Sequence, residues 1–167
     1  FTDCLLQRGA ARVVAVDVAY GQLDLRLRED HRVSVLERLN ARELAPADLP
    51  FVPGLATVDV SFISLAKVLP AVASCLTADG EVLAMIKPQF ELGRERVGKG
   101  VVRDAGDRRE AILAVALAAR DLGLSVRGFA SSGLPGPKGN RETFVWCGVS
   151  GKSIDDLEEA ITAAEPG

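Results

Sequence analysis

The stretch FTDCLLQRGAARVVAVDVAYGQL, residues 1–23, contains the sequence pattern that decides the fold. Its first part, Thr2 to Gln7, predicts a short helix that ends at Gly9, because glycine commonly follows a helix C-terminus. The apolar run 13–18 then predicts a strand covered on both faces, since it lacks polar alternation. A helix that leads into such a strand is typical of a doubly wound α/β domain.

One acidic residue, Asp17, lies near the carboxyl end of this strand. In nucleotide-binding α/β folds, an aspartate at the tip of the second strand accepts hydrogen bonds from ribose hydroxyls. A first strand and a glycine-rich turn precede the equivalent helix in those folds, and neither is found before Thr2. We therefore expect Asp17 to bind the ribose of a cofactor, in a nucleotide-binding corner that is N-terminally incomplete.

The composition sets the outer limits of size and partners. A chain of 167 residues, 48% of them hydrophobic, is enough for one domain with a core, which we expect to span 1–167. The net charge of -3 gives no global attraction to nucleic acid, so any RNA contact depends on a local basic patch. The longest apolar run, 65–76, is interrupted by Lys67 and Pro70 and is shorter than the roughly 20 residues that cross a bilayer. No membrane span is expected.

The cysteine and histidine content limits the possible metal chemistry. The three cysteines, Cys4, Cys75 and Cys147, lie in apolar segments without C-x-x-C spacing. This pattern predicts reduced core thiols in a cytoplasmic protein. With one histidine, His31, in a polar turn, the sequence cannot assemble a His/Cys zinc site, and no metal is expected.

Short runs rich in valine, alanine and isoleucine alternate with helical stretches along the rest of the chain. This alternation predicts parallel strands joined by crossover helices, so the predicted fold class is α/β. The predicted strands are 13–18, 32–37, 56–60, 81–87, 125–130 and 142–149, and the predicted helices are 2–7, 70–76, 107–122 and 153–164.

Three local features refine this prediction. The leucines of 23–27 alternate as in a strand, but a crossover is needed there between parallel strands, so we expect a helix. Capping-box spacing places two helix starts at Asp107 and Ser153. The turn 131–141 is too short for a crossover helix, so the last two strands are expected to pair antiparallel as a hairpin.

Three charged residues, Asp59, Lys87 and Glu142, lie near strand ends or at the start of the last strand. Enzymes of the α/β class place their chemistry at such positions. Lys87 follows a buried strand and precedes Pro88, and loss of hydration there favours the neutral amine that a general base needs. Plainer alternatives are a helix cap or loop acid for Asp59, a structural salt bridge for Lys87 and an ordinary strand-start carboxylate for Glu142.

The segment 90–103 is rich in glycine and basic residues and has no apolar period. We interpret it as a mobile basic loop beside the active site, where it would hold RNA phosphates. A solvated surface loop is the alternative, because Glu91 and Glu95 dilute the positive charge. The candidate RNA-binding residues are Arg94, Arg96, Lys99 and Arg103.

Four ordered motifs carry a family resemblance: DVAYGQL at 17–23, VDVSFISL at 58–65, KPQFELG at 87–93 and LPGPKGNRETF at 134–144. Together they resemble the TlyA-type ribosomal RNA 2′-O-methyltransferases, also called hemolysin-like proteins, of the FtsJ-like group. The resemblance runs from residue 1 to about 149. It implies a Rossmann-like S-adenosylmethionine-dependent methyltransferase sheet with an antiparallel C-terminal hairpin strand.

The resemblance also implies a Lys-Asp-Lys-Glu catalytic tetrad and cytidine 2′-hydroxyls of ribosomal RNA or ribosomal subunits as substrate. It places Asp59 on the aspartate, Lys87 on the second lysine and Glu142 on the glutamate. The first lysine, the glycine-rich turn and an N-terminal RNA-binding domain would precede Phe1. Lys87 would take the hydroxyl proton, while the two carboxylates orient the amine and the ribose.

The cofactor implied by this family is S-adenosylmethionine. Its expected contacts are Asp17 with the ribose hydroxyls, Asn40 and Ala41 with the adenine edge, and Asp59 near the methionine amine.

Two other functional classes remain open at this point. A nicotinamide-dependent Rossmann oxidoreductase would use Asp17 equally well, but it gives no role to the three charged residues near the strand ends. A non-enzymatic, membrane-active hemolysin is the second alternative, although no amphipathic membrane helix supports it.

The expected topology has a physical consequence. A strand missing from the centre of the sheet, between those that end near Asp17 and Asp59, would leave two strand edges unpaired. We therefore expect an N-terminal segment or another chain to fill the gap.

Overall fold

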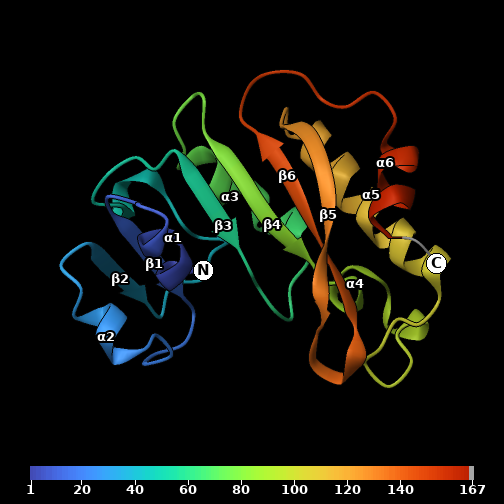
Figure 1. Cartoon of the computed structure of the whole chain (residues 1–167), viewed down its shortest axis with the longest axis horizontal. Helices are drawn as coiled ribbons and strands as arrows, with labels where there is room; N and C mark the ends of the chain where they lie inside the picture. The colour runs from blue at the N-terminus through green and yellow to red at the C-terminus, as the bar shows by residue number, and fades with distance from the viewer. Residues whose placement is uncertain (166–167) are drawn as a thin grey trace.

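The computed structural model describes residues 1–165 (Figure 1). Its strands are β1 (Val13–Asp17), β2 (Val33–Glu37), β3 (Leu55–Val58), β4 (Glu81–Ile86), β5 (Ser125–Pro135) and β6 (Arg141–Gly148). Its α-helices are α1 (Thr2–Gln7), α2 (Leu25–Arg28), α3 (Leu69–Ser74), α4 (Pro88–Glu91), α5 (Ala105–Asp121) and α6 (Leu157–Ala164). Short 3-10 turns are η1 (Pro46–Asp48), η2 (Leu65–Lys67), η3 (Arg94–Arg96) and η4 (Pro137–Gly139).

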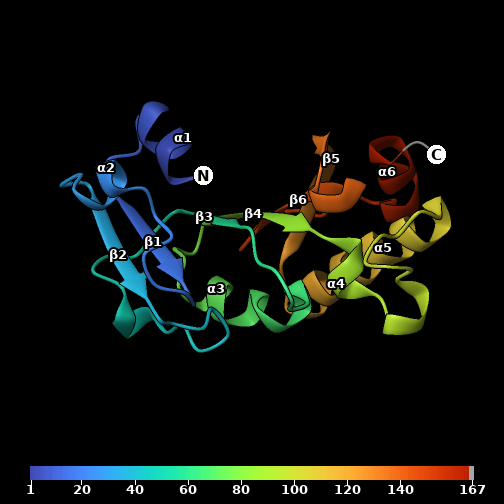
Figure 2. The ribbon, with the colours of Figure 1, turned by 90° about the horizontal axis from the view of Figure 1, so that it is seen from below.

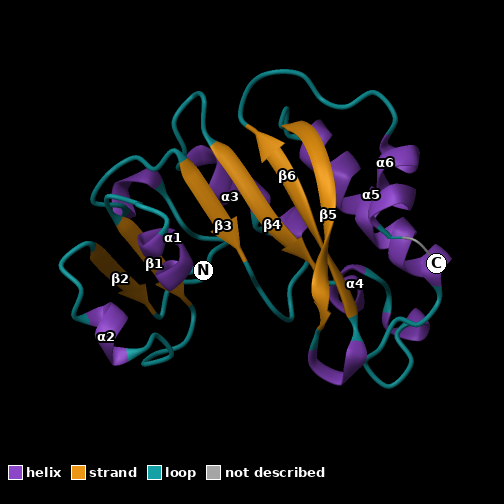
Figure 3. Cartoon of the chain, viewed as in Figure 1, coloured by secondary structure: helices purple, strands orange, loops and turns teal. Residues whose placement is uncertain are grey.

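The strands are hydrogen-bonded in two separate groups (Figure 3). In the first group β1 and β2 run parallel. In the second, with the order β3-β4-β6-β5, β3 and β4 run parallel, whereas β6 is antiparallel to both of its neighbours. The predicted α/β class with an antiparallel C-terminal hairpin strand is confirmed.

The edges of β1 and β3 face each other without pairing. No ladder joins them within residues 1–165, and a hollow of about 620 Å³ is lined by residues of both strands. Backbone N–H and C=O groups along such edges lack the strand partners that they have elsewhere in a sheet. The break lies where the sequence led us to expect a missing strand.

One face of the four-stranded sheet is covered by helices. The side chains of Val82, Ala84 and Ile86 on β4 are fully buried, in a core that includes residues of α3 and α5. In Figure 2, α3 lies on one side of the sheet and α1 on the other. Successive residues of a strand point to opposite faces, which explains why these three residues, at alternate positions of β4, share the buried face.

The opposite face is much less covered. On β6, Trp146 is 43% exposed and Phe144 is half-buried, with the ring of Phe1 in edge contact at a centroid distance of 6.1 Å. Leu83 and Met85 of β4 are cross-strand partners of these two aromatic residues and are only partly buried. The uncovered face is therefore apolar.

Two helix starts differ from the sequence prediction. Asp104, not Asp107, caps α5, because its side chain accepts a hydrogen bond from the N–H of Asp107 at 2.9 Å. Asp156 caps α6, while the hydroxyl of Ser153 accepts a hydrogen bond from the N–H of Val126 at 3.0 Å. More than one acidic or hydroxyl side chain lies near the start of each helix, and only the folded geometry selects the capping one.

The connection between β1 and β2 and the turn of the final hairpin can also be compared with the sequence prediction. The expected helix in 23–27 forms as α2, after Asp24 accepts a hydrogen bond from the N–H of Arg26 at 2.9 Å. The final hairpin is longer than predicted, because β5 continues to Pro135 across irregular pairing and the turn shrinks to 136–140. The added length belongs to β5, because β6 is shifted by only one residue from the predicted 142–149.

The cysteines correct one expectation. Cys75 and Cys147 are buried, but Cys4 is exposed, because α1 buries only Leu6. Burial raises the pKa of the Cys147 thiol to about 11, so this thiol stays protonated at neutral pH. No helix within the described part of the chain has the length and apolarity that crossing a membrane requires.

Candidate active site

Parallel pairing of β3 and β4 brings two of the predicted site residues into contact. Lys87 follows directly after β4, and its Nζ lies 2.6 Å from Oδ1 of Asp59, which follows β3. The same Nζ donates a hydrogen bond to the hydroxyl of Ser61 at 3.3 Å. The lysine side chain is 13% exposed and that of Asp59 is 43% exposed, so the pair lies at the rim of the sheet with one side open.

Glu142 is the second residue of the neighbouring strand β6 and is buried. A long hydrogen bond of 3.5 Å joins Nε2 of Gln89 to Oε1 of Glu142. Among residues 1–165, no hydrogen bond or ion pair joins Glu142 directly to Lys87. Gln89 is two residues after Lys87, so it links the lysine segment to the glutamate, a role that the sequence analysis did not identify.

The segment 87–91 organises the site, because successive residues contact different parts of it. Pro88 is the first residue of α4 and is buried, as its fixed φ and missing N–H allow. Phe90 packs against Phe62 with the ring centroids 5.0 Å apart. Oε1 of Glu91 accepts a hydrogen bond from the N–H of Leu65 at 2.9 Å.

Phe62 is an unusual residue beside the Lys87–Asp59 pair. Its side chain is 91% exposed and its φ is +63, a region that bulky L-residues rarely adopt and that costs about 1–3 kcal/mol. An exposed aromatic ring next to a reactive pair offers a surface on which a base can stack. Its only signal in the sequence is an aromatic residue between Ser61 and Ser64, shortly after Asp59.

A glycine permits the observed position of Glu142. Gly136 donates its N–H to the carbonyl oxygen of Asn140 at 2.7 Å. A Cβ at this glycine would lie 2.8 Å from Oε1 of Glu142, closer than real Cβ atoms come to a neighbour, and 3.2 Å from that carbonyl oxygen, which is tight. Gly136 is thus required by the close approach of the carboxylate.

We predict that Gly136→Ala displaces the Glu142 carboxylate while the fold is retained. The nearer contact is the end of a flexible side chain, so that end can move without unfolding the sheet. The methyl transfer that the family resemblance implies, measured in a protein extended at its N-terminus, should fall by roughly tenfold or more, as for a misplaced catalytic group. Gly128→Ala is the matched control, because a Cβ there has open space. Equal activity of the two variants would contradict the catalytic role expected for Glu142.

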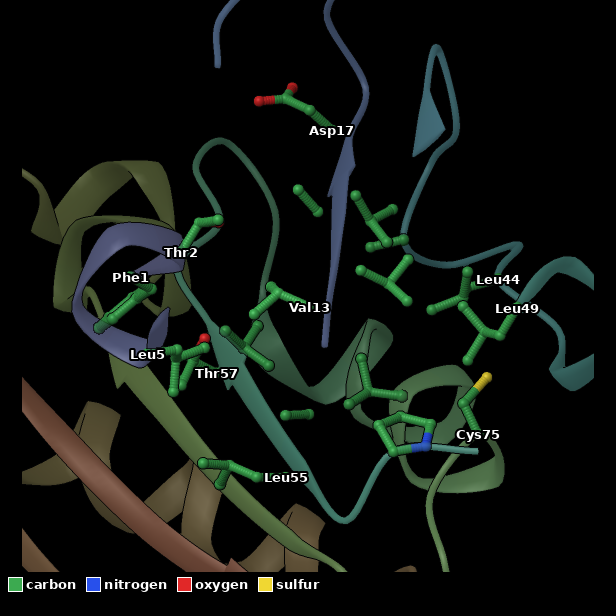
Figure 4. A pocket seen from close by; sticks show the side chains of 18 of the residues that line it. Phe1, Thr2, Leu5, Val13, Asp17, Leu44, Leu49, Leu55, Thr57 and Cys75 are labelled. Atoms are coloured by element: carbon green, nitrogen blue, oxygen red, sulfur yellow. The ribbon is translucent and has the colours of Figure 1, made fainter. Parts of the chain in front are cut away.

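The predicted cofactor residues gather around the hollow between β1 and β3, with one exception. Asp17, Ala41 and Asp59 all line it, and Figure 4 shows the carboxylate of Asp17 at one end of its apolar wall. Oδ1 of Asp17 accepts a hydrogen bond from the N–H of Ala19 at 2.7 Å. Asn40 does not line the hollow, and its Oδ1 accepts a hydrogen bond from the N–H of Arg42 at 3.1 Å.

The exposed carboxylates of Asp17 and Asp59, at the carboxyl ends of β1 and β3, fit a nucleoside whose ribose donates hydrogen bonds. Among the described side chains there is no group of three or more histidine, cysteine, aspartate or glutamate residues that could hold a metal ion.

The candidate RNA-binding residues differ in their contacts within the protein and in their exposure. Arg96 forms ion pairs with Asp107 and Glu110 of α5, and it lowers the pKa of Glu110. Lys99 and Arg103 are exposed. The side chain of Arg94 lies outside the described side chains. The structure thus gives Arg96 a contact that anchors the loop to α5.

Burial also affects Glu91. Desolvation raises the pKa of this carboxyl above its ordinary value of 4.5, against hydrogen bonds from Leu65 and Ser64 that lower it. A raised pKa in the folded state means that ionisation costs stability, and the cost grows as pH rises from 4.5 through the folded value.

Glu91→Gln should therefore raise the melting temperature at pH 7 by about 2–4 °C, because the amide oxygen still accepts from Leu65 without a buried charge. The gain should vanish below pH 4.5, where the carboxyl is neutral in both states. Melting curves from acid to neutral pH test this, with exposed Glu95→Gln as control. A gain that is independent of pH would refute it.

Comparisons of the sequence with a family model and with known relatives agree with each other. A model of the family described as FtsJ-like methyltransferase matches residues 1–149. The chain is 48% identical, over 98% of its length, to the 16S/23S rRNA (cytidine-2′-O)-methyltransferase TlyA of Mycobacterium tuberculosis. It is 39% identical, over 85% of its length, to a protein named hemolysin A in Brachyspira hyodysenteriae. The chain spans 63% and 60% of the lengths of these two relatives.

Solved structures show the same fold. A crystal structure of a protein from Lactococcus lactis that carries the name hemolysin has a TM-score of 0.92 and 42% identity, with 98% of this chain and 81% of that chain covered. A geranyl diphosphate methyltransferase in complex with S-adenosylmethionine has a TM-score of 0.56 and 14% identity, with 89% and 73% covered, and shares the fold alone. These similarities confirm the resemblance inferred from the four motifs.

Proposed function

The chain belongs to the FtsJ-like methyltransferase family, and on that basis we propose that it transfers a methyl group from S-adenosylmethionine to cytidine 2′-hydroxyls of ribosomal RNA. The observation that carries this proposal is the 2.6 Å contact between Lys87 and Asp59 at adjacent strand ends. The family, the name of the Mycobacterium tuberculosis relative and the buried Glu142 nearby support it.

The reaction needs deprotonation and alignment more than covalent chemistry. S-adenosylmethionine supplies a methyl group that is already activated by its positively charged sulfur, whereas a ribose hydroxyl is a weak nucleophile. In the form with a neutral amine, Lys87 accepts the proton of the 2′-hydroxyl and becomes the ammonium ion, a contribution of about 10²–10⁴ in rate for a positioned base. Asp59 holds the lysine amine in place, and Glu142, which Gln89 reaches through a long hydrogen bond, orients the ribose.

The rim of the hollow at the carboxyl ends of β1 and β3, where Asp17 and Asp59 lie, is the proposed cofactor side of the site, and the remainder of the hollow is the space of the added strand. Asp17 accepts hydrogen bonds from the ribose hydroxyls, and Ala41 contacts the adenine edge. Asp59 lies near the methionine amine. Asn40 stays a proposed contact of the adenine edge, although its carboxamide oxygen is already used within its own turn.

We also propose that an extended segment fills the gap between β1 and β3 and brings the glycine-rich turn and the first lysine of the tetrad. The unpaired edges of both strands support this, since each has backbone groups available for a parallel partner. The residues 1–167 would then form one methyltransferase domain that acts in the cytoplasm on ribosomal RNA or ribosomal subunits.

The test uses an extended form, in which the stretch that precedes the matched region of the Mycobacterium tuberculosis relative is joined to Phe1. Ribosomal subunits are incubated with this form and methyl-labelled S-adenosylmethionine, and the RNA is digested to nucleosides. We expect 2′-O-methylcytidine to carry the label. Label on another nucleoside would overturn the substrate, and absence of label from RNA and protein substrates alike would overturn the proposed activity.

A further inference from the structure

Two turns next to Glu142 each present a lysine in a left-handed conformation. In the first, Gly98 and Val101 form a bridge, and Lys99 between them has a φ of +51. In the second, at the tip of the β5–β6 hairpin, Lys138 has a φ of +63. Both lysines are exposed. Lysine rarely adopts this conformation, so two cases in adjacent turns indicate that tertiary contacts hold the turns in shape.

One buried side chain connects the two turns. Asn140 is 3% exposed, its Oδ1 accepts a hydrogen bond from the N–H of Val102 at 3.1 Å, and its Nδ2 donates to the carbonyl oxygen of Gly100 at 2.8 Å. Its own carbonyl oxygen accepts from the N–H of Gly136 at 2.7 Å. A carboxamide that both donates and accepts across 38 residues of sequence fixes the turns relative to each other.

The two lysines are positioned for an external partner. A Cβ at Gly100 would lie 3.5 Å from Nζ of Lys138, so the second lysine lies across the first turn. Within residues 1–165, no ion pair or hydrogen bond engages the ammonium group of Lys99 or Lys138, whereas Arg96 nearby is held by two carboxylates. The carboxylate of Glu142, two residues after Asn140, is buried rather than exposed to them.

We propose that Lys99 and Lys138 form a phosphate clamp for the RNA strand, and that Asn140 is a positioning residue which fixes the clamp relative to Glu142. The inference rests on the proposed function, because it assigns the clamp to the substrate of that site. Phosphate contacts set the register of a nucleic acid on a protein without reading its sequence. A clamp built on the hairpin that carries Glu142 thus sets which ribose faces Lys87.

The first experiment measures binding of single-stranded ribosomal RNA by the extended form across a range of salt concentrations, without cofactor. Each phosphate contact to a single strand contributes about 0.7 to the slope of log affinity against log salt. Lys99→Ala/Lys138→Ala should reduce the slope by about 1.4, and Lys138→Ala alone by about 0.7. Lys152→Ala, exposed beyond the opposite end of β6, should leave the slope unchanged.

The second measurement tests the positioning role. Asn140→Ala should reduce the slope by about as much as the double lysine variant, and combining all three changes should reduce it no further. If Asn140 had a merely structural role, Asn140→Ala would lower the melting temperature, and any effect on the slope would add to that of the lysine changes. In addition, RNA should protect Lys99 and Lys138, but not Lys152, from acetylation, as read by mass spectrometry.

The outcomes separate this inference from the proposed function. Unchanged slopes for the lysine variants, with normal RNA binding and methyl transfer, would overturn the clamp alone. Additive effects of Asn140→Ala would overturn the positioning role. Wild-type extended protein that neither binds nor methylates RNA would overturn the proposed function itself.

Discussion

Lys87→Arg in the extended form should abolish methyl transfer to RNA while it preserves the fold and the ion pair with Asp59. Arginine stays charged at any pH that proteins tolerate, so it can pair with the carboxylate but cannot accept the proton of a 2′-hydroxyl. The expected loss in turnover is about 10²-fold or more, the contribution of a positioned general base. Affinity for S-adenosylmethionine should remain within about threefold, since the base acts on the RNA hydroxyl.

This variant separates two explanations of the 2.6 Å contact. If the contact is only a structural salt bridge, arginine should replace lysine with little loss of turnover. Lys87→Ala provides the second comparison, because it removes both the base and the ion pair, and it should be as inactive as Lys87→Arg. The Asp59 side chain is 43% exposed, so its carboxylate stays hydrated and the alanine variant should still fold. Retained turnover in either variant would remove Lys87 from the mechanism.

The second large effect concerns the broken sheet. The extended form should melt about 10 °C higher than residues 1–167 alone, because a strand between β1 and β3 would pair with both free edges. Each new hydrogen bond contributes about 0.5–1.5 kcal/mol net, and ordering each added residue costs about 1–2 kcal/mol. Apolar burial over the hollow and over the open face at Phe144 and Trp146 supplies the remaining gain, about 3 kcal/mol in all.

Thermal unfolding of the two forms, followed by circular dichroism, measures this difference. An inserted proline at the centre of the added strand is the control, because it removes a ladder hydrogen bond. That variant should lose most of the gain. Equal melting temperatures for the two forms, together with a cooperative monomeric transition, would show that the strand edges need no partner.

Much of the fold followed from local sequence patterns. Unbroken apolar runs predicted the parallel strands β1 and β4, and a short connection predicted the antiparallel hairpin, because both depend on residues that are close in sequence. The expected cover on both faces is wrong, since β4 alternates between buried and half-buried residues and β1 buries only Val13. The position of Lys87 and Asp59 near strand ends could also be predicted, whereas their contact was implied by the family resemblance and not by a local pattern. The break between β1 and β3 could be anticipated from the topology of the matched motifs.

Features that depend on tertiary contact could not be read from the sequence. Asn140 reaches Gly100 across 40 residues, and Gln89 reaches Glu142 across 53, so no local pattern signals either hydrogen bond. The left-handed conformation of Phe62 is imposed by its surroundings, against the preference of the residue. Cys4 looked like a core thiol only because its neighbours are apolar, whereas the exposure of α1 depends on what covers that helix.

The most direct test of the methyltransferase assignment is a calorimetric titration of S-adenosylmethionine into the extended form and into residues 1–167 alone. We predict saturable binding by the extended form, weakened at least tenfold by Asp17→Ala, and no binding by the shorter chain. Absence of binding to both forms would contradict the account and return attention to a non-enzymatic role, which leakage of lipid vesicles at low protein concentration would then test.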